Sequence, residues 1–530
     1  MSCRFPKLTG LLAACLLAAT VLGASAVPDE GDELIAEFKR FYTADRSPQE
    51  RLQGVLVLKG LDRLAAAQAL LPALEDDDLA VRQATVEILS AHKAPETAAW
   101  LLGDVLQGKK FSKKKLVRAN AALVLGGMRS APAYPALLAL LEEKETELRL
   151  AGIAALGRMG DPEACPSLSA LAAEPDGIVA VAAVDALVAI GDAPRASEAV
   201  LGAMQHADWS VRAAAIRGVV ALKLKDGVPI LIERMEVEDG RLIGDAFKAL
   251  RTLTLRDFGD DPVAWAEWWE RSKANFELPD PKKLEEEEQR LAKLGIKYSK
   301  VASRKKTKEF LGVETKSENI VFVIDVSGSM ETPFGDPDRL KFTGRTYTSL
   351  QRLEIVKEEL IATIQELPET TAFNILTFSS DVTPWKKDLN KANVLNKNNA
   401  SSFVRGLKPV GGAAAGFKAQ TGLTSNLVEA GGTNIRSAML CALGIPGDPI
   451  DIGDAASRPP KTPVDTVFFL TDGEPTVGRS VDMNVIRGEV RRVNQYRGVQ
   501  IHIIYVGEFG GDDFEDLAHE NGGIFVAIGG

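Results

Sequence analysis

The chain has 530 residues, of which 45% are apolar, and its formal net charge is 63 minus 73, or −10. This length predicts more than one domain and enough apolar material for a buried core. The negative charge excludes nonspecific nucleic-acid binding as the main role, because such binding depends on basic residues that neutralise phosphates.

Residues 1–26 have the composition of a signal peptide. Arg4 and Lys7 give a positive start, residues 8–23 are apolar, and Ala24-Ser25-Ala26 is an A-x-A cleavage site. Without these residues the charge is 61 minus 73, or −12. We therefore predict an exported protein that is periplasmic, on the cell surface or secreted, with residues 27–48 as an N-terminal leader.

A second interpretation of the same segment is a lipid anchor. Leu12-Ala13-Ala14-Cys15 resembles a bacterial lipobox, in which Cys15 would be lipidated. The apolar run continues beyond Cys15, which favours ordinary cleavage. No other segment has the roughly 18 to 20 uninterrupted apolar residues that a membrane-spanning helix needs.

The cysteines exclude a disulfide framework. Two of the four lie in the predicted signal peptide, which leaves Cys165 and Cys441 far apart in the chain. This spacing also excludes a C-x-x-C metal or redox site. We expect both to be small core residues.

Residues 49–255 are rich in Ala, Leu and Val and repeat themselves. Four dipeptides open apolar patterns of helical period. They are Val81-Arg82, Val117-Arg118, Leu148-Arg149 and Val211-Arg212. The arginines are 36, 31 and 63 residues apart, with Val179-Ala180 as a degenerate copy in the longest gap. A period near 31 with two helices per unit predicts an all-α solenoid, and the pattern resembles short bacterial HEAT repeats in about five or six copies.

Residues 256–277 predict a Trp-rich capping helix. Trp265, Trp268 and Trp269 follow Asp260-Asp261-Pro262 at a spacing that places them on one face of an N-capped helix. Carbohydrate stacking is the alternative, but an exposed solenoid end needs covering, which favours a hydrophobic cap. Residues 278–314 then have a Glu-rich run before a Lys-rich run and are predicted to be a charged linker.

Residues 315–530 alternate strand and helix patterns. Buried strands are expected at 320–324, 373–378, 467–470, 501–506 and 524–528, and helical patterns fall at 353–367, 435–443, 485–496 and 513–520. Such alternation predicts an α/β domain with a doubly wound, mainly parallel, Rossmann-like sheet. Ligands of such sheets bind outside the carboxyl ends of the strands.

Oxygen-bearing side chains gather where two of these strands end. Asp325, Ser327 and Ser329 end the first strand, and Asp472 follows the strand at 467–470. Thr433 lies on a loop at a helix start. A hard divalent cation such as Mg²⁺ takes oxygen ligands of this kind. The five side chains therefore predict a metal site at the carboxyl edge of the sheet.

The order Asp-x-Ser-x-Ser, then Thr, then Asp resembles the metal-ion-dependent adhesion site of von Willebrand factor type A domains. The resemblance covers residues 315–530 and implies that these five residues hold Mg²⁺ or Mn²⁺, with Asp325 and Asp472 as anchors. It also implies that an Asp or Glu carboxylate of a protein partner takes the open coordination position. Glu474 lies beside the site, where it either tunes the ion or faces solvent.

Two segments depart from the family pattern. Gly411-Gly412 is followed by Ala413, which has no hydroxyl, so Thr433 is the expected ligand and residues 412–427 are an insertion. Residues 331–350 form a second extra loop directly after the Asp-x-Ser-x-Ser turn. Both are expected on the metal face, where they either shape partner choice or serve as plain surface loops.

These observations predict a bacterial exported interaction or adhesion protein that is not an enzyme, with the solenoid as its scaffold. The sequence has neither a G-x-x-x-x-G-K-[ST] nucleotide loop nor a G-x-S-x-G nucleophile elbow. An accessory or regulatory subunit of an envelope enzyme or assembly complex is one alternative. A scaffold with a vestigial metal site is another.

Overall fold

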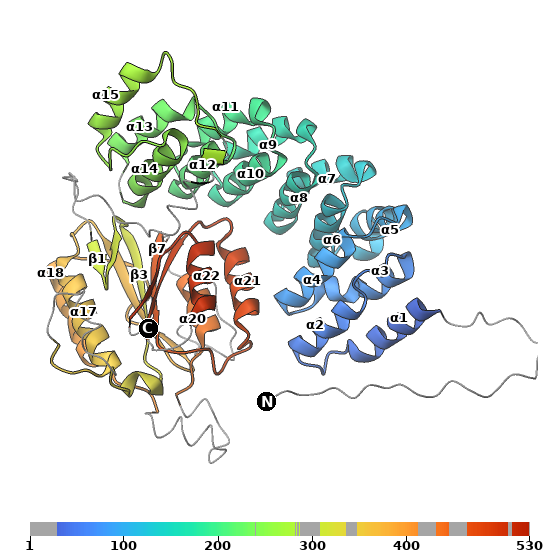
Figure 1. Ribbon diagram of the computed structural model, residues 1–530. Coiled ribbons are helices and arrows are strands. Elements are labelled where there is room, and N and C mark those ends of the chain that lie inside the picture. Colours follow the sequence, from blue (N-terminus) through green and yellow to red (C-terminus); the bar gives the residue numbers. More distant parts are fainter. Residues whose placement is uncertain are drawn as a thin grey trace, which may run out of the picture.

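The computed structural model describes residues 29–238, 240–280, 282–283, 286, 308–334, 347–411, 431–444, 464–506 and 511–528. The predicted signal peptide with Cys15, the insertion at 412–427 and much of the predicted linker and of the loop at 331–350 lie outside these residues. An all-helical solenoid is followed by an α/β domain, and the solenoid curves around one side of that domain (Figure 1). The predicted fold class is confirmed.

Paired helices build the solenoid. Its helices are α1 (Glu30–Phe41), α2 (Pro48–Val57), α3 (Leu64–Leu70), α4 (Leu79–Ser90), α5 (Pro95–Trp100), α6 (Lys115–Gly127), α7 (Tyr134–Ala139), α8 (Thr146–Met159), α9 (Cys165–Ala172), α10 (Gly177–Ile190), α11 (Ala193–Ala203), α12 (Trp209–Ala221), α13 (Gly227–Val237), α14 (Arg241–Thr254) and α15 (Pro262–Ser272). Shorter helical turns are η1 (Leu71–Glu75), η2 (Leu101–Leu106), η3 (Lys109–Phe111), η4 (Ala131–Ala133), η5 (Leu140–Glu142) and η6 (Pro162–Ala164). One continuous apolar core runs through them. No helix in the described ranges is long and apolar enough to cross a membrane.

The repeated arginines tie neighbouring repeats together. Each of three reaches an acidic residue 25 or 26 positions further along the chain, in the next repeat. The pairs are Arg118–Glu143 at 3.1 Å, Arg149–Glu174 at 2.6 Å and Arg212–Glu238 at 2.6 Å. The same guanidinium groups donate to backbone carbonyls of the inter-helix segments. This ladder explains why an arginine recurs once in each of these repeats.

The tryptophan helix α15 packs against α13 at the end of the solenoid. Trp265 is fully buried, and its indole N–H donates to the carbonyl of Gly259 at 2.8 Å. Trp268 meets this ring edge-on, with centroids 5.8 Å apart. Trp265 therefore covers the last repeat. It is not a carbohydrate-binding residue, because a ring with no exposed face cannot stack on a sugar.

The α/β domain has a largely parallel sheet. Its strands are β3 (Asn319–Asp325), β4 (Ala372–Phe378), β5 (Val382–Pro384), β6 (Asn390–Lys391), β7 (Thr466–Thr471), β8 (Gln500–Tyr505) and β9 (Phe525–Ala527). The order is β5-β4-β3-β7-β8-β9, with β6 also paired to β4. Strands β4, β3, β7, β8 and β9 are parallel, and only β5 and β6 pair antiparallel. The central strands are buried on both faces, which is why they appear as uninterrupted apolar runs.

Helices cover both faces of this sheet. They are α17 (Arg352–Glu366), α18 (Val394–Arg405), α20 (Ile435–Ala442), α21 (Met483–Asn494) and α22 (Asp512–Glu520), with the turn η7 (Gly328–Glu331) after β3. α17 and α18 share one apolar core with one face, whereas α20, α21 and α22 share a second core with the other. Cys165 and Cys441 are both buried, as predicted.

A hairpin precedes the sheet within the residues assigned above to the linker. It consists of β1 (Lys308–Phe310) and β2 (Val313–Thr315). Phe310 is buried and packs edge-on against Phe322 of β3 and Phe468 of β7, with centroids 5.3 and 5.6 Å apart. The α/β domain therefore gathers part of its core from before residue 315.

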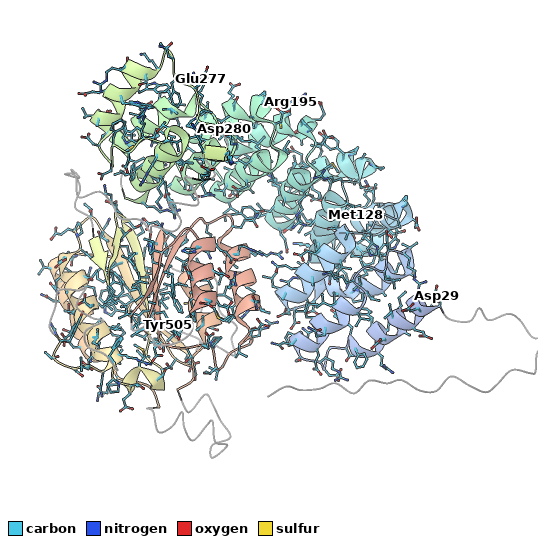
Figure 2. All side chains as sticks on the ribbon, in the orientation of Figure 1. Asp29, Met128, Arg195, Glu277, Asp280 and Tyr505 are labelled. Carbon is cyan, nitrogen blue, oxygen red and sulfur yellow. The ribbon has the colours of Figure 1, made fainter. Side chains whose placement is uncertain are left out.

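The solenoid contacts the domain at the amino ends of β7 and β8 and at the segment between β7 and α21. The Arg241 guanidinium donates to the carbonyls of Asp465, next to β7, and Gly498, next to β8. A further ion pair joins Arg479 to Asp77 at 2.9 Å. Arg195, in contrast, lies on the outer side of the curve, away from the domain (Figure 2). The inner side of the solenoid thus faces the α/β domain of the same chain. Where the two are in contact, the concave surface of the solenoid is covered by that domain.

Candidate metal centre

The carboxyl end of β3 delivers Asp325 and the two serines. Asp325 is fully buried, and one of its carboxylate oxygens accepts from the Ser327 N–H at 2.8 Å. That bond fixes the turn that follows the strand. The Ser327 and Ser329 hydroxyls are 3.0 Å apart.

Strand β7 brings the second carboxylate to the same edge. Its parallel register sets Ile324 beside Leu470, so Thr471 and Asp472 come next to Asp325. The Ser329 hydroxyl donates to Asp472 at 2.7 Å, and the Thr471 hydroxyl donates to Asp325 at 2.7 Å. Four of the five predicted ligand residues are thereby joined by hydrogen bonds into one cluster.

Thr433 belongs to a loop that touches this cluster. The Gly328 N–H donates to the Gly431 carbonyl at 3.3 Å, so the loop before α20 lies against the turn after β3. The backbone N–H of Thr433 donates to the Thr476 hydroxyl at 2.8 Å. Gly431 has φ +73°, and a Cβ there would meet the Val410 carbonyl oxygen at 1.8 Å, so only glycine fits.

Two residues of the cluster were not identified from the sequence. Thr471 holds the second oxygen of Asp325, and Arg352, at the start of α17, forms an ion pair with Asp472 at 2.9 Å. Thr471 directly precedes the predicted ligand Asp472 and ends strand β7. That position could have indicated from the sequence that its hydroxyl belongs to the cluster. Arg352 lies 120 positions from its partner, and no local pattern indicates that contact. Glu474 is exposed at the rim, two residues after Asp472.

The electrostatics of the cluster suit a cation. Burial, with the neighbouring Asp472, raises the pKa of Asp325 to about 7. Burial also raises the pKa of Asp472, although Ser329 and Arg352 oppose the change. Of the two buried carboxylates only Asp472 pairs with an arginine, Arg352, which leaves an excess of negative charge away from water. Carboxylate and hydroxyl oxygens are ligands that Mg²⁺ and Mn²⁺ accept, so the residues fit such an ion.

Comparisons with known proteins match both parts of the chain. The von Willebrand factor type A domain matches residues 319–528, and HEAT repeats match residues 102–188 and 168–251. These matches confirm the resemblance inferred from the motifs. Type A domains commonly bind a divalent metal at this kind of site.

Two curated relatives show the extent of the similarity. Inter-alpha-trypsin inhibitor heavy chain H4 of Homo sapiens is 30% identical over 218 residues, which are 40% of this chain and 18% of the relative. Heavy chain H1 of Mesocricetus auratus is 30% identical over 180 residues, 33% of this chain and 15% of the relative. The chain thus spans less than a fifth of these relatives.

Among solved structures, a von Willebrand factor type A protein from Catenulispora acidiphila is 17% identical. The similarity covers 41% of this chain and 39% of that chain, with a TM-score of 0.26. An overlap of this extent carries no argument about function.

Proposed function

Because the chain consists of HEAT repeats followed by a von Willebrand factor type A domain, we propose that it binds an acidic group of a protein partner through a divalent cation. Both modules support a role in protein interaction, and type A domains act as non-enzymatic interaction modules. We further propose that the protein is exported, because residues 1–26 have the composition of a signal peptide.

One observation carries this proposal. Asp325 and Asp472 are both buried at one edge of the sheet and are bridged through serine hydroxyls, and Arg352 supplies the ion pair. Burying two carboxylates is costly unless positive charge balances them. A divalent cation provides that balance, which favours a working metal site over a vestigial one.

Each residue then has a defined task. Asp325 and Asp472 hold the cation by charge, and the Ser327, Ser329 and Thr433 hydroxyls set its geometry. The bound ion supplies a coordination position for a carboxylate oxygen of the partner. Thr471 keeps Asp325 oriented through its hydroxyl. The low local dielectric strengthens the attraction between the ion and an incoming carboxylate.

The placement of the solenoid agrees with this role. Arg241 contacts the backbone at the amino ends of β7 and β8, whereas Asp325 and Asp472 lie at the carboxyl ends of β3 and β7. The Arg241 contact and the metal centre are therefore at opposite edges of the sheet, whereas the Arg479–Asp77 ion pair involves the segment that follows Asp472. A partner can approach the metal without displacing Arg241 from its contact.

The test is calorimetric titration of Mg²⁺ and Mn²⁺ into the chain from residue 27 onward. The variants are Asp325→Ala and, as a matched control, Asp381→Ala, an exposed aspartate after β4 outside the cluster. We expect binding by the natural chain and the control, and none by Asp325→Ala. Metal binding that survives in Asp325→Ala would contradict the assignment.

The partner is tested by a pull-down from an envelope extract on the immobilised chain. Capture should need Mg²⁺ or Mn²⁺, be lost with Asp325→Ala and be reversed by a chelator. Capture that a chelator does not release would assign the interaction to another surface, such as the solenoid.

A further inference from the structure

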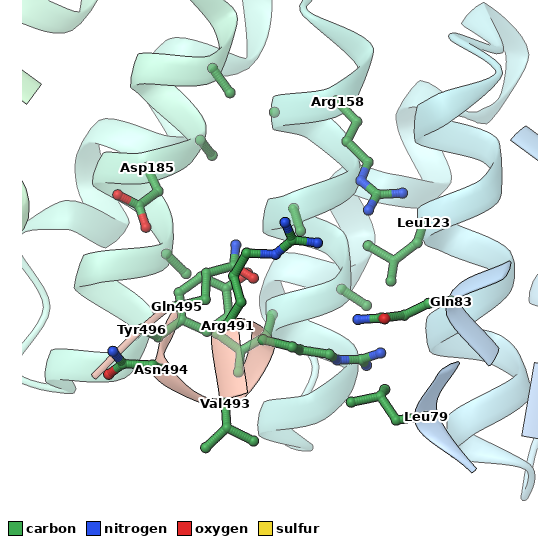
Figure 3. A pocket seen from close by; sticks show the side chains of 18 of the residues that line it. Leu79, Gln83, Leu123, Arg158, Asp185, Arg491, Val493, Asn494, Gln495 and Tyr496 are labelled. Carbon is green, nitrogen blue, oxygen red and sulfur yellow. The ribbon is translucent and has the colours of Figure 1, made fainter. Parts of the chain in front are cut away.

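A large cavity lies between the inner side of the solenoid and helix α21 of the type A domain. Its volume is about 1070 Å³. Alternate solenoid helices line one wall, namely α4, α6, α8, α10, α12 and α14, and the end of α21 with the segment to Val499 lines the other. Figure 3 shows Gln83 and Arg158 on the solenoid helices, facing the end of α21 with Arg491 and Tyr496. The space is large enough for a small organic molecule.

Arginines face one another across this cavity. Arg82 of α4 and Arg158 of α8 lie on the solenoid wall, and Arg491 and Arg492 lie on the wall formed by α21. Like charges on opposing surfaces repel, whereas surfaces that only pack together normally bring complementary charges into contact. The chain as a whole is acidic, so this gathering of positive charge does not follow from composition.

These four arginines differ from the others that line the cavity. Arg217 lies 3.8 Å from Asp185, and Arg241 pairs with Asp245 at 3.0 Å. Within the described residues, none of the four forms an ion pair with a carboxylate. Four acids also line the cavity. Asp185 lies beside Arg217 and Glu520 pairs with Arg487, so only the exposed Glu87 and Glu147 are left to accompany the four unpaired arginines among the described residues.

Arg82 shows the shortage of acids most directly. It occupies the repeat position at which Arg118 and Arg149 meet an acid 25 residues further on, but residue 107 is glutamine. Its guanidinium donates only to the backbone carbonyls of Asp76 and Asp77, and its buried Nε has no hydrogen-bond partner. A buried unpaired donor is costly and indicates a missing acceptor.

Burial strengthens the same argument. It lowers the pKa of Arg82, and burial together with the nearby Arg82 and Arg158 lowers the pKa of Arg492. Glu147 acts on both groups in the opposite direction but does not restore their ordinary pKa values. Arg82 and Arg492 thus lose water without gaining enough negative charge, and a bound anion would supply what is missing.

We propose that this cavity binds a small organic polyanion carrying phosphate or carboxylate groups, which bridges the solenoid and the type A domain. Guanidinium groups recognise both kinds of oxyanion through paired N–H donors. Because the arginines come from both walls, the anion holds the two modules together. This site is separate from the metal centre and takes a ligand of the opposite charge.

The proposal is tested by calorimetric titration of pyrophosphate and, separately, of citrate into the chain from residue 27 onward. The buffer contains no divalent cation, because both anions chelate metals. The test variant is the double substitution Arg158→Gln with Arg492→Gln. The matched control is Arg195→Gln, since Arg195 is exposed on the outer side of the solenoid and pairs with Asp192 at 2.6 Å.

We expect the natural chain and the control to bind at least one anion, and the double variant to bind it at least about tenfold more weakly, as expected for losing two charge-assisted contacts. Binding of pyrophosphate alone assigns a phosphate ligand, and binding of citrate alone assigns a carboxylate ligand. If the natural chain binds neither anion, or the double variant binds as tightly as the control, the proposal is wrong.

A second measurement keeps the test decisive if the double variant does not fold. Hydrogen exchange of the natural chain should slow in both α4 and α21 when the anion is added, because the ligand contacts both walls. The exposed substitution Arg491→Gln, checked for folding by circular dichroism, should reduce that protection. Protection confined to one wall would contradict the bridging role.

Discussion

Two regions of the molecule leave opposite charges uncompensated. At the carboxyl edge of the sheet, Asp325 and Asp472 are both buried, and only Asp472 pairs with an arginine, Arg352. Beside α21, Arg82 and Arg492 lie near one another without a carboxylate partner among the described residues. Arg436 and Glu489, by contrast, are both buried and pair with each other at 2.6 Å. The two unbalanced regions are informative because a bound ligand can balance a buried charge.

The comparison implies that the two regions bind different ligands independently. A cation should not compete for the arginines, nor an anion for the aspartates. Substitutions that unbalance one region should therefore change one affinity and spare the other.

Asp472→Asn should have the largest effect. The substitution removes one of two anchoring charges, and Arg352 is left without its ion-pair partner. We expect the Kd for Mg²⁺ to rise by about 100-fold or more, because ligand charge largely sets the affinity of such sites. Calorimetry measures the change, with Asp381→Asn as the control. Loss of citrate or pyrophosphate binding in Asp472→Asn would show that the two regions are not independent.

His502 on β8 should make stability depend on pH. Burial, then Lys248 and Arg241 of α14, lowers the pKa of His502 to about 3, so the folded chain keeps this ring neutral. Its Nδ1 accepts from the Ile524 N–H at 3.1 Å. The unfolded chain takes up a proton below about pH 6.5, whereas the folded chain does not, so acid favours unfolding.

The free energy of unfolding should fall by about 2 kcal/mol between pH 7.5 and pH 5 through this group alone. Urea unfolding at both pH values measures the fall. His502→Gln should lack the pH-dependent part because glutamine does not take up a proton, while its side-chain oxygen can still accept from the Ile524 N–H. An equal fall in the natural chain and in His502→Gln would contradict the assignment. The contribution should be complete above about pH 7.5 and lost progressively as the pH falls.

Much of the metal site was predictable because its signals are local. Asp325, Ser327 and Ser329 stand within five residues at the end of an apolar run, and Asp472 directly follows another such run. Parallel strands bring their carboxyl ends to one edge, so the order of the motif determines the grouping. That these residues bind metal stays a prediction until it is measured.

The arginine-lined cavity was not predictable in this way. Arg82, Arg158 and Arg492 lie on helices far apart in sequence and meet only because the solenoid curves onto its own domain. The short strands β5 and β6 escaped detection for a different reason. They have three and two residues, too few to show a period.

Arg352→Gln should have a smaller effect and the opposite sign. Removing a positive charge 2.9 Å from a metal-anchoring carboxylate should tighten Mg²⁺ binding by about tenfold. Calorimetry with Arg405→Gln, an exposed arginine on α18, as the control measures this gain. Weaker binding would instead show that Arg352 orients Asp472 for the ion and that its positioning outweighs its charge.

Gln107→Glu should have the smallest effect. It tests whether Arg82, on the solenoid wall of the cavity, contributes to anion binding. The substitution supplies the acid missing from the repeat ladder, at the same spacing of 25 residues as Arg118–Glu143 and Arg149–Glu174. We expect the free energy of unfolding to rise by about 0.5–1 kcal/mol, since the pair would be partly exposed. Anion binding should weaken several-fold, because Arg82 would turn to the new carboxylate. Urea unfolding and calorimetry measure the two effects, with Gln68→Glu, exposed on α3 and outside the cavity, as the control. A gain in stability without loss of anion affinity would remove Arg82 from the site and leave Arg158, Arg491 and Arg492 to hold the ligand.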